Sequence, residues 1–237
     1  MPTVQHARRE IHCKVVYYGP GLGGKTTNLE FIHAKSRADR RGKLLSLAGE
    51  SERTLFFDLL PLEIGEFKGY HVRLFLCTVP GQIAHDRTRQ MVLRNVDGIV
   101  FVVDSQRARI EENTESIANL AQNLRLQGDD PDAMPLVVQY NKRDLPDVAT
   151  PDELRAALRV PAWVPQVEAT ATLGTGVFET LKAATRQCLS LVGDPRRAPE
   201  GRSPSIMPGQ RASIYPSAGE PAPALPRPPR LPSTGED

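Results

Sequence analysis

The sequence contains no apolar run approaching the roughly 20 residues that cross a bilayer, so we expect no integral membrane segment. Its formal charge of +2 gives no general attraction to nucleic acid. Three cysteines, an odd number without a secretory leader, favour reduced thiols in a cytoplasmic protein. The start Met-Pro and the lack of a C-terminal prenylation cysteine predict no lipid anchor. These absences leave a globular intracellular protein as the expectation.

Large apolar residues become scarce after residue 192. Residues 193–237 contain 11 of the 21 prolines, and such a composition cannot bury enough surface to offset the cost of ordering. We therefore predict a flexible N-terminus over residues 1–9, one folded domain over 10–192, and a disordered proline-rich tail over 193–237. For the tail, a spacer is favoured over a partner-binding segment.

Strand patterns and helix patterns alternate between residues 10 and 192. Continuous apolar runs are typical of strands covered on both faces, and apolar residues at helical spacing are typical of helices that pack on a sheet. The expected strands cover residues 11–18, 71–78, 98–104, 136–140 and 164–168. The expected helices cover residues 26–34, 110–124, 152–158 and 177–191. The alternation predicts an α/β fold, a three-layer and mostly parallel sheet with helices on both faces.

A glycine-rich loop follows the first expected strand. Residues 19–26 fit G-x-x-x-x-G-K-[ST], in which backbone N–H groups surround a phosphate chain. Lys25 is expected to neutralise the outer phosphates, and the Thr26 hydroxyl to bind Mg²⁺. Thr27 can offer its amide to the inner phosphate. The nucleotide-binding residues predicted here are Gly19, Gly21, Leu22, Gly23, Gly24, Lys25, Thr26 and Thr27.

A second motif, Asn-Lys-Arg-Asp at residues 141–144, begins 116 residues after Lys25. The Asp144 carboxylate can accept two hydrogen bonds from the N1–H and the amino group of guanine, and adenine offers no such pair of donors. Asn141 is expected to tie this loop to the glycine loop, and Lys142 to pack along the purine. Together the motifs predict binding of GTP and GDP. A P-loop kinase or ATPase is the alternative enzyme class, against which the second motif counts.

A GTPase also needs a threonine that senses the γ-phosphate and Mg²⁺, a glycine amide at that phosphate, and a glutamine that orients water. Thr54, Gly81 and Gln82 occur in this order. The predicted Mg²⁺ ligands are therefore Thr26 and Thr54. A non-hydrolysing GTP-binding scaffold that recruits partners through its tail is a further alternative, and retention of Lys25, Thr26 and Gln82 argues against it.

Six segments resemble the MglA-type small GTPases, bacterial Ras-like proteins of gliding motility and cell polarity. The resemblance covers about residues 8–192, and the segments that carry it are 19–28, 52–61, 78–82, 96–102, 141–146 and 176–181. It implies a P-loop small GTPase fold and a molecular switch with weak intrinsic hydrolysis. It also implies a Roadblock-fold (MglB-type) activating protein, polarity or motility effectors, and a cytoplasmic protein that partners recruit to a cell pole.

The resemblance assigns further residues. Arg53 matches an arginine finger supplied by the same chain, and Gln82 matches the residue that positions water, so these two are the predicted catalytic residues. Ala171 matches the position whose amide meets the guanine carbonyl oxygen. Thr78 departs from the general Ras-like pattern, which has an aspartate there, although MglA-type proteins share the threonine. Slower hydrolysis and looser Mg²⁺ binding are expected from it, and Asp58 is one carboxylate that could compensate.

A basic loop precedes the expected switch segment. By default it is solvated surface, and contact with an acidic partner or an anionic lipid is the less favoured interpretation. Its cationic residues are Lys35, Arg37, Arg40, Arg41 and Lys43.

Overall fold

The computed structural model describes residues 1–47, 57–81 and 86–193. In these ranges the chain forms one sheet of eight strands, in the order β3-β4-β5-β2-β6-β7-β8, with β1 paired to β2. The strands are β1 Thr3–Gln5, β2 Glu10–Tyr18, β3 Leu45–Leu47, β4 Phe57–Phe67, β5 Tyr70–Thr78, β6 Gly98–Asp104, β7 Leu136–Asn141 and β8 Gln166–Glu168. The α-helices are α1 Lys25–Lys35, α2 Asp86–Leu93, α3 Ile110–Leu126, α4 Pro151–Leu158 and α5 Val177–Val192.

The centre of the sheet is parallel. Strand β2 lies between β5 and β6, and β6, β7 and β8 follow, all in parallel pairing. Every residue of β6 is buried, as its continuous apolar run predicts for a strand covered on both faces. Antiparallel pairing involves β1, β3 and β4. The predicted α/β fold is confirmed, and the sheet is more mixed than the sequence patterns indicate.

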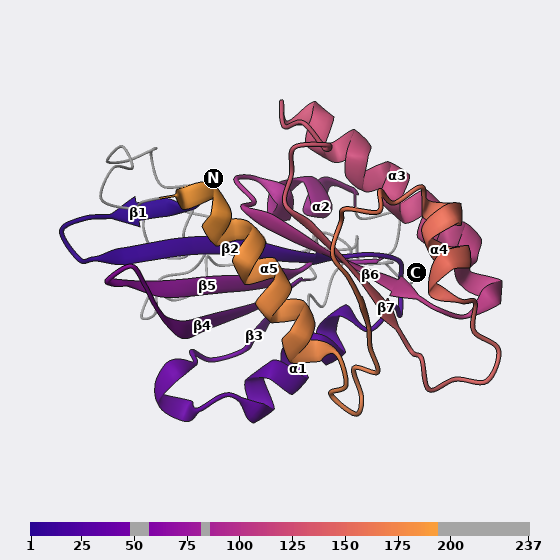
Figure 1. The fold of residues 1–237 in the computed structure, drawn as a ribbon, viewed down its shortest axis with the longest axis horizontal. Helices are drawn as coiled ribbons and strands as arrows, with labels where there is room; N and C mark the ends of the chain where they lie inside the picture. The colour runs from indigo at the N-terminus through magenta and orange to yellow at the C-terminus, as the bar shows by residue number, and fades with distance from the viewer. Residues whose placement is uncertain (48–56, 82–85, 194–237) are drawn as a thin grey trace, which may run out of the picture. The chain divides into compact units, whose positions relative to one another are not determined.

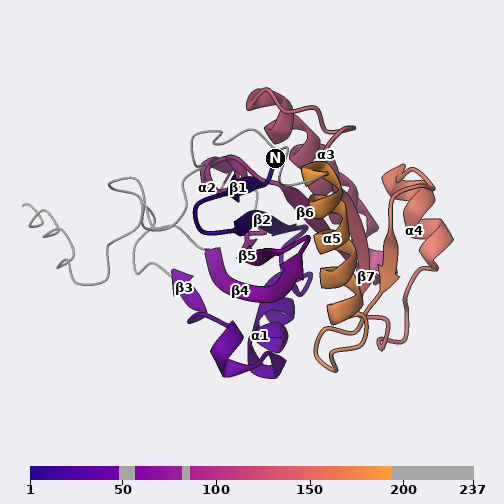
Figure 2. The ribbon, with the colours of Figure 1, turned by 60° about the vertical axis from the view of Figure 1, so that its left-hand side comes forward.

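Helices cover both faces of the sheet (Figures 1 and 2). Helices α1 and α5 contact each other and pack on strands of one face, whereas α3 packs on β6 between α2 and α4. The loops after β2, β6 and β7 therefore emerge at one edge, because parallel strands end on the same side. Asp104, the last residue of β6, is the register partner of Asn141, the last residue of β7. The two sequence motifs are thus brought to one edge of the sheet.

Four segments differ from the expectations, and one of them is β3, whose three residues are too few to show a strand pattern. Residues 3–5, in the segment predicted to be flexible, form β1, which pairs with β2 and buries Val4. Strand β4 was not expected, because Pro61 and Gly65 interrupt its alternation; the pairing register with β5 shifts just before Gly65, whose φ is 118°. Helix α2 was not expected because its sequence is mainly polar. Each of these elements depends on tertiary pairing that local patterns do not reveal.

A buried polar network joins α1, β7 and α5. The side-chain amides of Asn28 and Gln139 exchange two hydrogen bonds of 2.9 Å. Gln139 also donates to the Thr180 hydroxyl, and Asn28 donates to the carbonyl of Gly24 in the glycine loop. Both amide side chains are fully buried. The network therefore fixes the helix that follows the glycine loop against the strand that leads to the second motif.

Replacing Gln139 by Leu is expected to lower the free energy of unfolding by about 1–3 kcal/mol, because the buried Asn28 carbonyl oxygen loses its partner. The double variant Asn28→Leu/Gln139→Leu is expected to recover part of that loss, since both polar partners are then gone. Urea unfolding measures both. The exposed Gln122→Leu on α3 is the matched control, and a loss equal to that of this control would contradict the prediction.

Candidate functional site

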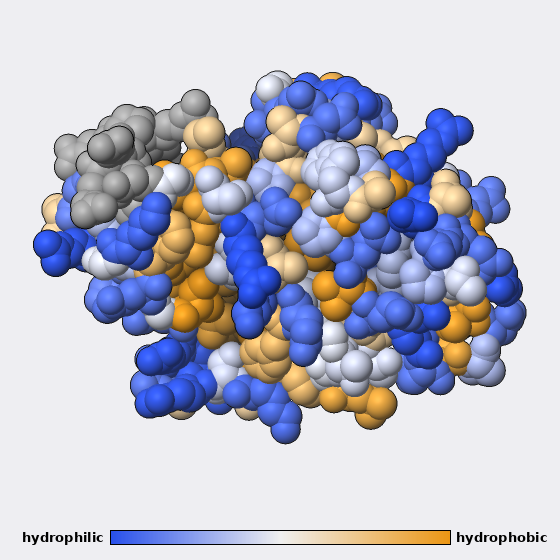
Figure 3. Space-filling view, in the orientation of Figure 1, coloured by the Kyte–Doolittle hydropathy of each residue, from blue (hydrophilic) through white to orange (hydrophobic). Residues whose placement is uncertain are grey.

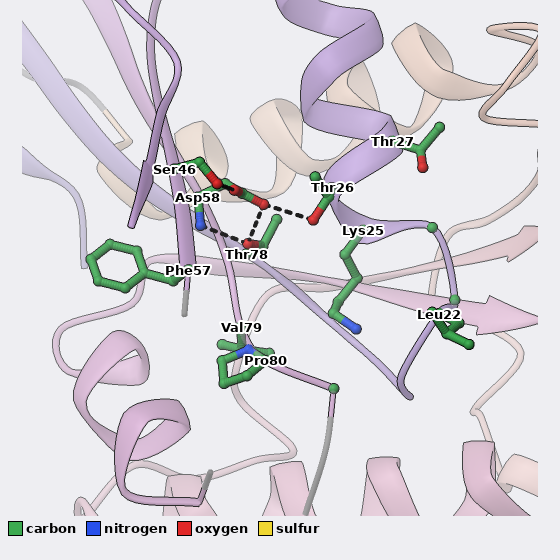
Figure 4. A pocket seen from close by; sticks show the side chains of 13 residues that line it. Leu22, Lys25, Thr26, Thr27, Ser46, Phe57, Asp58, Thr78, Val79 and Pro80 are labelled. Carbon is green, nitrogen blue, oxygen red and sulfur yellow. Dashed lines mark hydrogen bonds between the residues drawn. The ribbon is translucent and has the colours of Figure 1, made fainter. Parts of the chain in front are cut away.

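A cavity of about 430 Å³ lies between the glycine loop, β3, β4 and the end of β5 (Figure 4). This size is within the range of small-molecule sites. It brings together residues of the glycine loop and residues after β5 that the sequence assigns to a phosphate site. The cavity is lined by Leu22, Gly23, Gly24, Lys25, Thr26, Thr27, Ser46, Phe57, Asp58, Thr78, Val79, Pro80 and Gly81.

Glycine is required at the last position before α1. Gly24 has a φ of 98°, and a Cβ built on it would lie 2.2 Å from Asn141 Nδ2. Because Gly24 has no side chain, the loop can turn into α1 while its backbone stays in contact with Asn141 of the second motif. The loop amides then point to the same place as the first amides of α1, which forms a site for an anion. Leu22 has a φ of 61° and an exposed fraction of 89%. Its side chain stands at the rim of the cavity.

The Lys25 ammonium lies inside the glycine loop. Its Nζ donates to the carbonyl oxygens of Gly19 at 3.0 Å and Pro20 at 2.6 Å. The pKa of Lys25 is lowered from 10.5 to about 8, mainly by burial and also by the positive charge of Arg89, while the negative charge of Asp58 opposes both. The chain thus holds a desolvated cation beside the loop amides, which favours an anionic ligand.

Asp58 on β4 is the centre of a cluster of hydroxyl groups (Figure 4). Its Oδ2 accepts from the hydroxyls of Thr26 at 2.7 Å and Thr78 at 2.9 Å. Its Oδ1 accepts from Ser46 at 2.6 Å, and its backbone N–H donates to Thr78 Oγ1 at 2.8 Å. Only 5% of Asp58 is exposed. Ser46 could not be predicted as part of this cluster, because no pattern in the sequence relates β3 to β4.

Asn141 bridges the two motifs. Its Nδ2 donates to the carbonyl of Gly23 at 2.9 Å, so the predicted link between the loops is present. Its Oδ1 accepts from the Ala171 N–H at 2.9 Å. The Ala171 amide thus already has an acceptor, and a contact with guanine would have to share that hydrogen. Asp144 is exposed, and its carboxylate makes no hydrogen bond or ion pair with any other described residue.

A second link between the motifs passes through Asp104. This fully buried carboxylate accepts from Lys142 Nζ at 2.6 Å and lies 4.0 Å from the Arg109 guanidinium. Arg109 in turn donates to the carbonyl of Gly21 at 3.1 Å. The sequence does not mark Asp104 and Arg109 as site residues, because Asp104 simply ends an apolar strand and Arg109 lies in no motif. They orient Lys142 and the glycine loop from outside the cavity.

Three predicted residues, Arg53, Thr54 and Gln82, lie outside the described residues. Gly81, just before the last of them, is described. A Cβ on Gly81 would lie 2.3 Å from Gly21 Cα, so its backbone is in direct contact with the glycine loop. A residue with a side chain could not make this approach.

Within the described ranges, no group of three or more His, Cys, Asp or Glu side chains could hold a metal ion. The donors beside Lys25 are instead the Thr26 hydroxyl and the Asp58 carboxylate. Hard oxygen donors of this kind, completed by phosphate oxygens, suit Mg²⁺. The residues present therefore fit the metal that the motif implies.

The described helices include none with the length and apolar character to cross a membrane. On the face shown in Figure 3, hydrophobic residues reach the surface in patches among hydrophilic ones.

Comparisons with known proteins agree with this geometry. The model of the ADP-ribosylation factor family (Arf) matches residues 4–188. The chain is 52% identical over 190 residues to the mutual gliding-motility protein MglA of Myxococcus xanthus (strain DK1622), an alignment that spans 80% of this chain and 97% of the relative. The similarity covers the glycine loop, the second motif and the strands between them. This chain therefore belongs to the ADP-ribosylation factor family and is a small Ras-like GTPase of the MglA type.

Proposed function

We propose that this GTP-binding switch protein hydrolyses GTP with Mg²⁺ and acts in cell polarity or motility. The observation that carries the proposal is the Asn141 side chain, which joins the carbonyl of Gly23 to the Ala171 amide. It connects a phosphate loop to a loop with the donor and acceptor pattern for guanine. The relative's name supports the cellular role.

In the proposed complex the glycine loop and the start of α1 hold the phosphates. Lys25 moves its hydrogen bonds from the loop carbonyls to the outer phosphates, and Asp144 accepts from the guanine edge. Lys142, held by Asp104, packs along the purine. The proposed nucleotide-binding set is Gly19, Gly21, Leu22, Gly23, Gly24, Lys25, Thr26, Thr27, Gly81, Asn141, Lys142, Asp144 and Ala171.

Mg²⁺, when bound, neutralises the charge that develops between the β- and γ-phosphates. Thr26 and Thr54 are the residues proposed to hold it. Gln82 orients the attacking water, and Arg53 stabilises the charge on the transferred group. Gly81 offers an amide at the γ-phosphate, for which its contact with the glycine loop provides the position.

Because Arg53 and Gln82 belong to this chain, an activating protein can work by arranging them. We propose a Roadblock-fold (MglB-type) activator, polarity or motility effectors that distinguish the GTP and GDP states, and a cytoplasmic protein that such partners recruit to a cell pole. The segment 193–237 is proposed as a spacer.

Single-turnover phosphate release from GTP tests the enzymatic part of the proposal. We expect slow release with Mg²⁺, acceleration by a Roadblock-fold partner, and no release with excess EDTA. A flat trace under all three conditions, with GTP bound throughout, would favour the alternative of a non-hydrolysing scaffold.

The affinity for GDP is expected to fall as pH rises above about 8. Free Lys25 loses its proton near that pH, whereas phosphate binding favours the charged form, so binding takes up a proton above pH 8. The affinity should therefore drop by up to about tenfold per pH unit between the pKa of Lys25 in the free protein and its pKa in the GDP complex. Fluorescent GDP titrations from pH 7 to about 9 measure this slope.

Lys25→Arg is the matched control, because arginine keeps its charge throughout this range. The variant is expected to bind GDP more weakly than the wild type at neutral pH, and its affinity is expected to change less between pH 7 and about 9. Deprotonation of guanine itself affects both proteins equally. Identical slopes in the two proteins would contradict the role of Lys25.

A further inference from the structure

Asp58 is the sole acidic residue among the described residues that line the cavity. It lies on β4, it is buried, and its Oδ2 is 2.7 Å from the Thr26 hydroxyl. Thr26 is the threonine of the phosphate-loop motif, the residue that such motifs place on Mg²⁺. A buried carboxylate at hydrogen-bond distance from this hydroxyl stands at the metal side of the phosphate site.

The Asp58 carboxylate is buried, and its side-chain partners are the hydroxyl groups of Thr26, Ser46 and Thr78. Leaving a carboxylate buried beside hydroxyls alone is costly, since hydroxyl donors do not neutralise it. A divalent cation would supply the missing positive charge.

The neighbouring strand holds this carboxylate in place. Thr78, at the end of β5, donates its hydroxyl to Asp58 Oδ2 and accepts from the Asp58 backbone N–H. Position 78 is where the general Ras-like pattern has an aspartate. A side chain on β4 thus brings a carboxylate to the same point of the cavity from the adjacent strand.

We propose that Asp58 supplies the protein carboxylate of the Mg²⁺ site, and that Thr78 is the positioning residue that orients it. The inference rests on the proposed function, because it concerns the Mg²⁺ that accompanies the nucleotide. Asp58 also ties β3 to β5 through Ser46 and Thr78, and the test has to separate that structural role from the metal role.

The test measures how Mg²⁺ slows the dissociation of fluorescent GDP. In Asp58→Asn, an isosteric change, the Mg²⁺ concentration for half of the effect is expected to rise about 10–100-fold, with dissociation in EDTA little changed. Ser46→Ala removes one hydroxyl partner of the same carboxylate and is expected to keep the wild-type Mg²⁺ dependence. Asp58→Asn/Thr78→Asp returns a carboxylate from the other strand and is expected to restore most of that dependence.

The outcomes separate this inference from the function on which it rests. If the wild type binds no GDP, the proposed function fails. If the wild type binds GDP with a clear Mg²⁺ effect and Asp58→Asn shows the same Mg²⁺ dependence, the role of Asp58 alone is wrong. Equal losses in Asp58→Asn and Ser46→Ala, without rescue by Thr78→Asp, would also overturn it.

A measurement on the wild type covers the case in which Asp58→Asn does not fold. Mn²⁺ replaces Mg²⁺ in the GDP complex, and aspartate carboxyl carbons are labelled with ¹³C. Electron–nuclear double resonance is expected to show a ¹³C coupling from a carboxylate beside the metal. Such a coupling would be assigned to Asp58, because no other acidic residue among the described ones lines the cavity. Absence of the coupling would overturn the proposal.

Discussion

Asp144→Asn is expected to weaken GTP binding by roughly 10²–10⁴-fold. Two hydrogen bonds from the guanine edge to a charged carboxylate contribute about 1.5–3 kcal/mol each, and an asparagine cannot accept both. Asp144 is exposed and unpaired with other described residues, so the substitution disturbs no contact seen in the structure. Competition against fluorescent GDP measures the loss.

The same variant is expected to gain affinity for xanthosine triphosphate. Xanthine keeps the N1–H but has a carbonyl in place of the amino group, and the asparagine side chain offers one acceptor and one donor to match. Asp147→Asn, an exposed position in the same loop, is the control with the same change in charge. If Asp144→Asn and Asp147→Asn keep the same preference for GTP, Asp144 does not select the base.

Arg53→Ala is expected to slow activator-stimulated GTP hydrolysis by about 10³–10⁵-fold, the range found for arginine fingers. Gln82→Leu is expected to slow it strongly as well, because the attacking water loses its hydrogen-bonding partner. Both residues lie outside the described part of the chain, so the prediction comes from the motif order and the family. Single-turnover phosphate release with the Roadblock-fold partner is the measurement.

GTP affinity separates chemistry from binding in these variants. We expect the dissociation constants of Arg53→Ala and Gln82→Leu to stay near that of the wild type. Arg8→Ala is a suitable control, because Arg8 is exposed in the turn between β1 and β2, at the end of β2 opposite the glycine loop. Wild-type turnover in both variants would show that the catalytic assignment is wrong.

The central strands and the two motifs could be predicted because their signals are local. A fully buried parallel strand such as β6 is apolar throughout, and a phosphate loop needs glycines at fixed spacing. The loop also shows why the spacing is strict, since a side chain at Gly24 would collide with Asn141. Local chemistry and the fold agree at these positions.

The residues that support the site could not be predicted, because they act across strands. Nothing in the sequence relates Ser46 to Asp58, or Arg109 to the carbonyl of Gly21, until the sheet is assembled. The same holds for Asn28 and Gln139, which read as ordinary polar residues and prove to be a buried pair. The residues that would contact phosphate and base belong to local sequence motifs. The residues that orient them come together only through the order and register of the strands.

The most direct test of the central claim is an equilibrium competition between GTP and ATP for the protein loaded with fluorescent GDP. The assignment of Asp144 and Asn141 predicts that half of the probe is displaced by GTP at a concentration at least about a hundredfold lower than that needed with ATP. The reason is that adenine leaves the Asp144 carboxylate without its two donors. Displacement by ATP at the same concentration as GTP would contradict guanine selection and favour a P-loop kinase or ATPase.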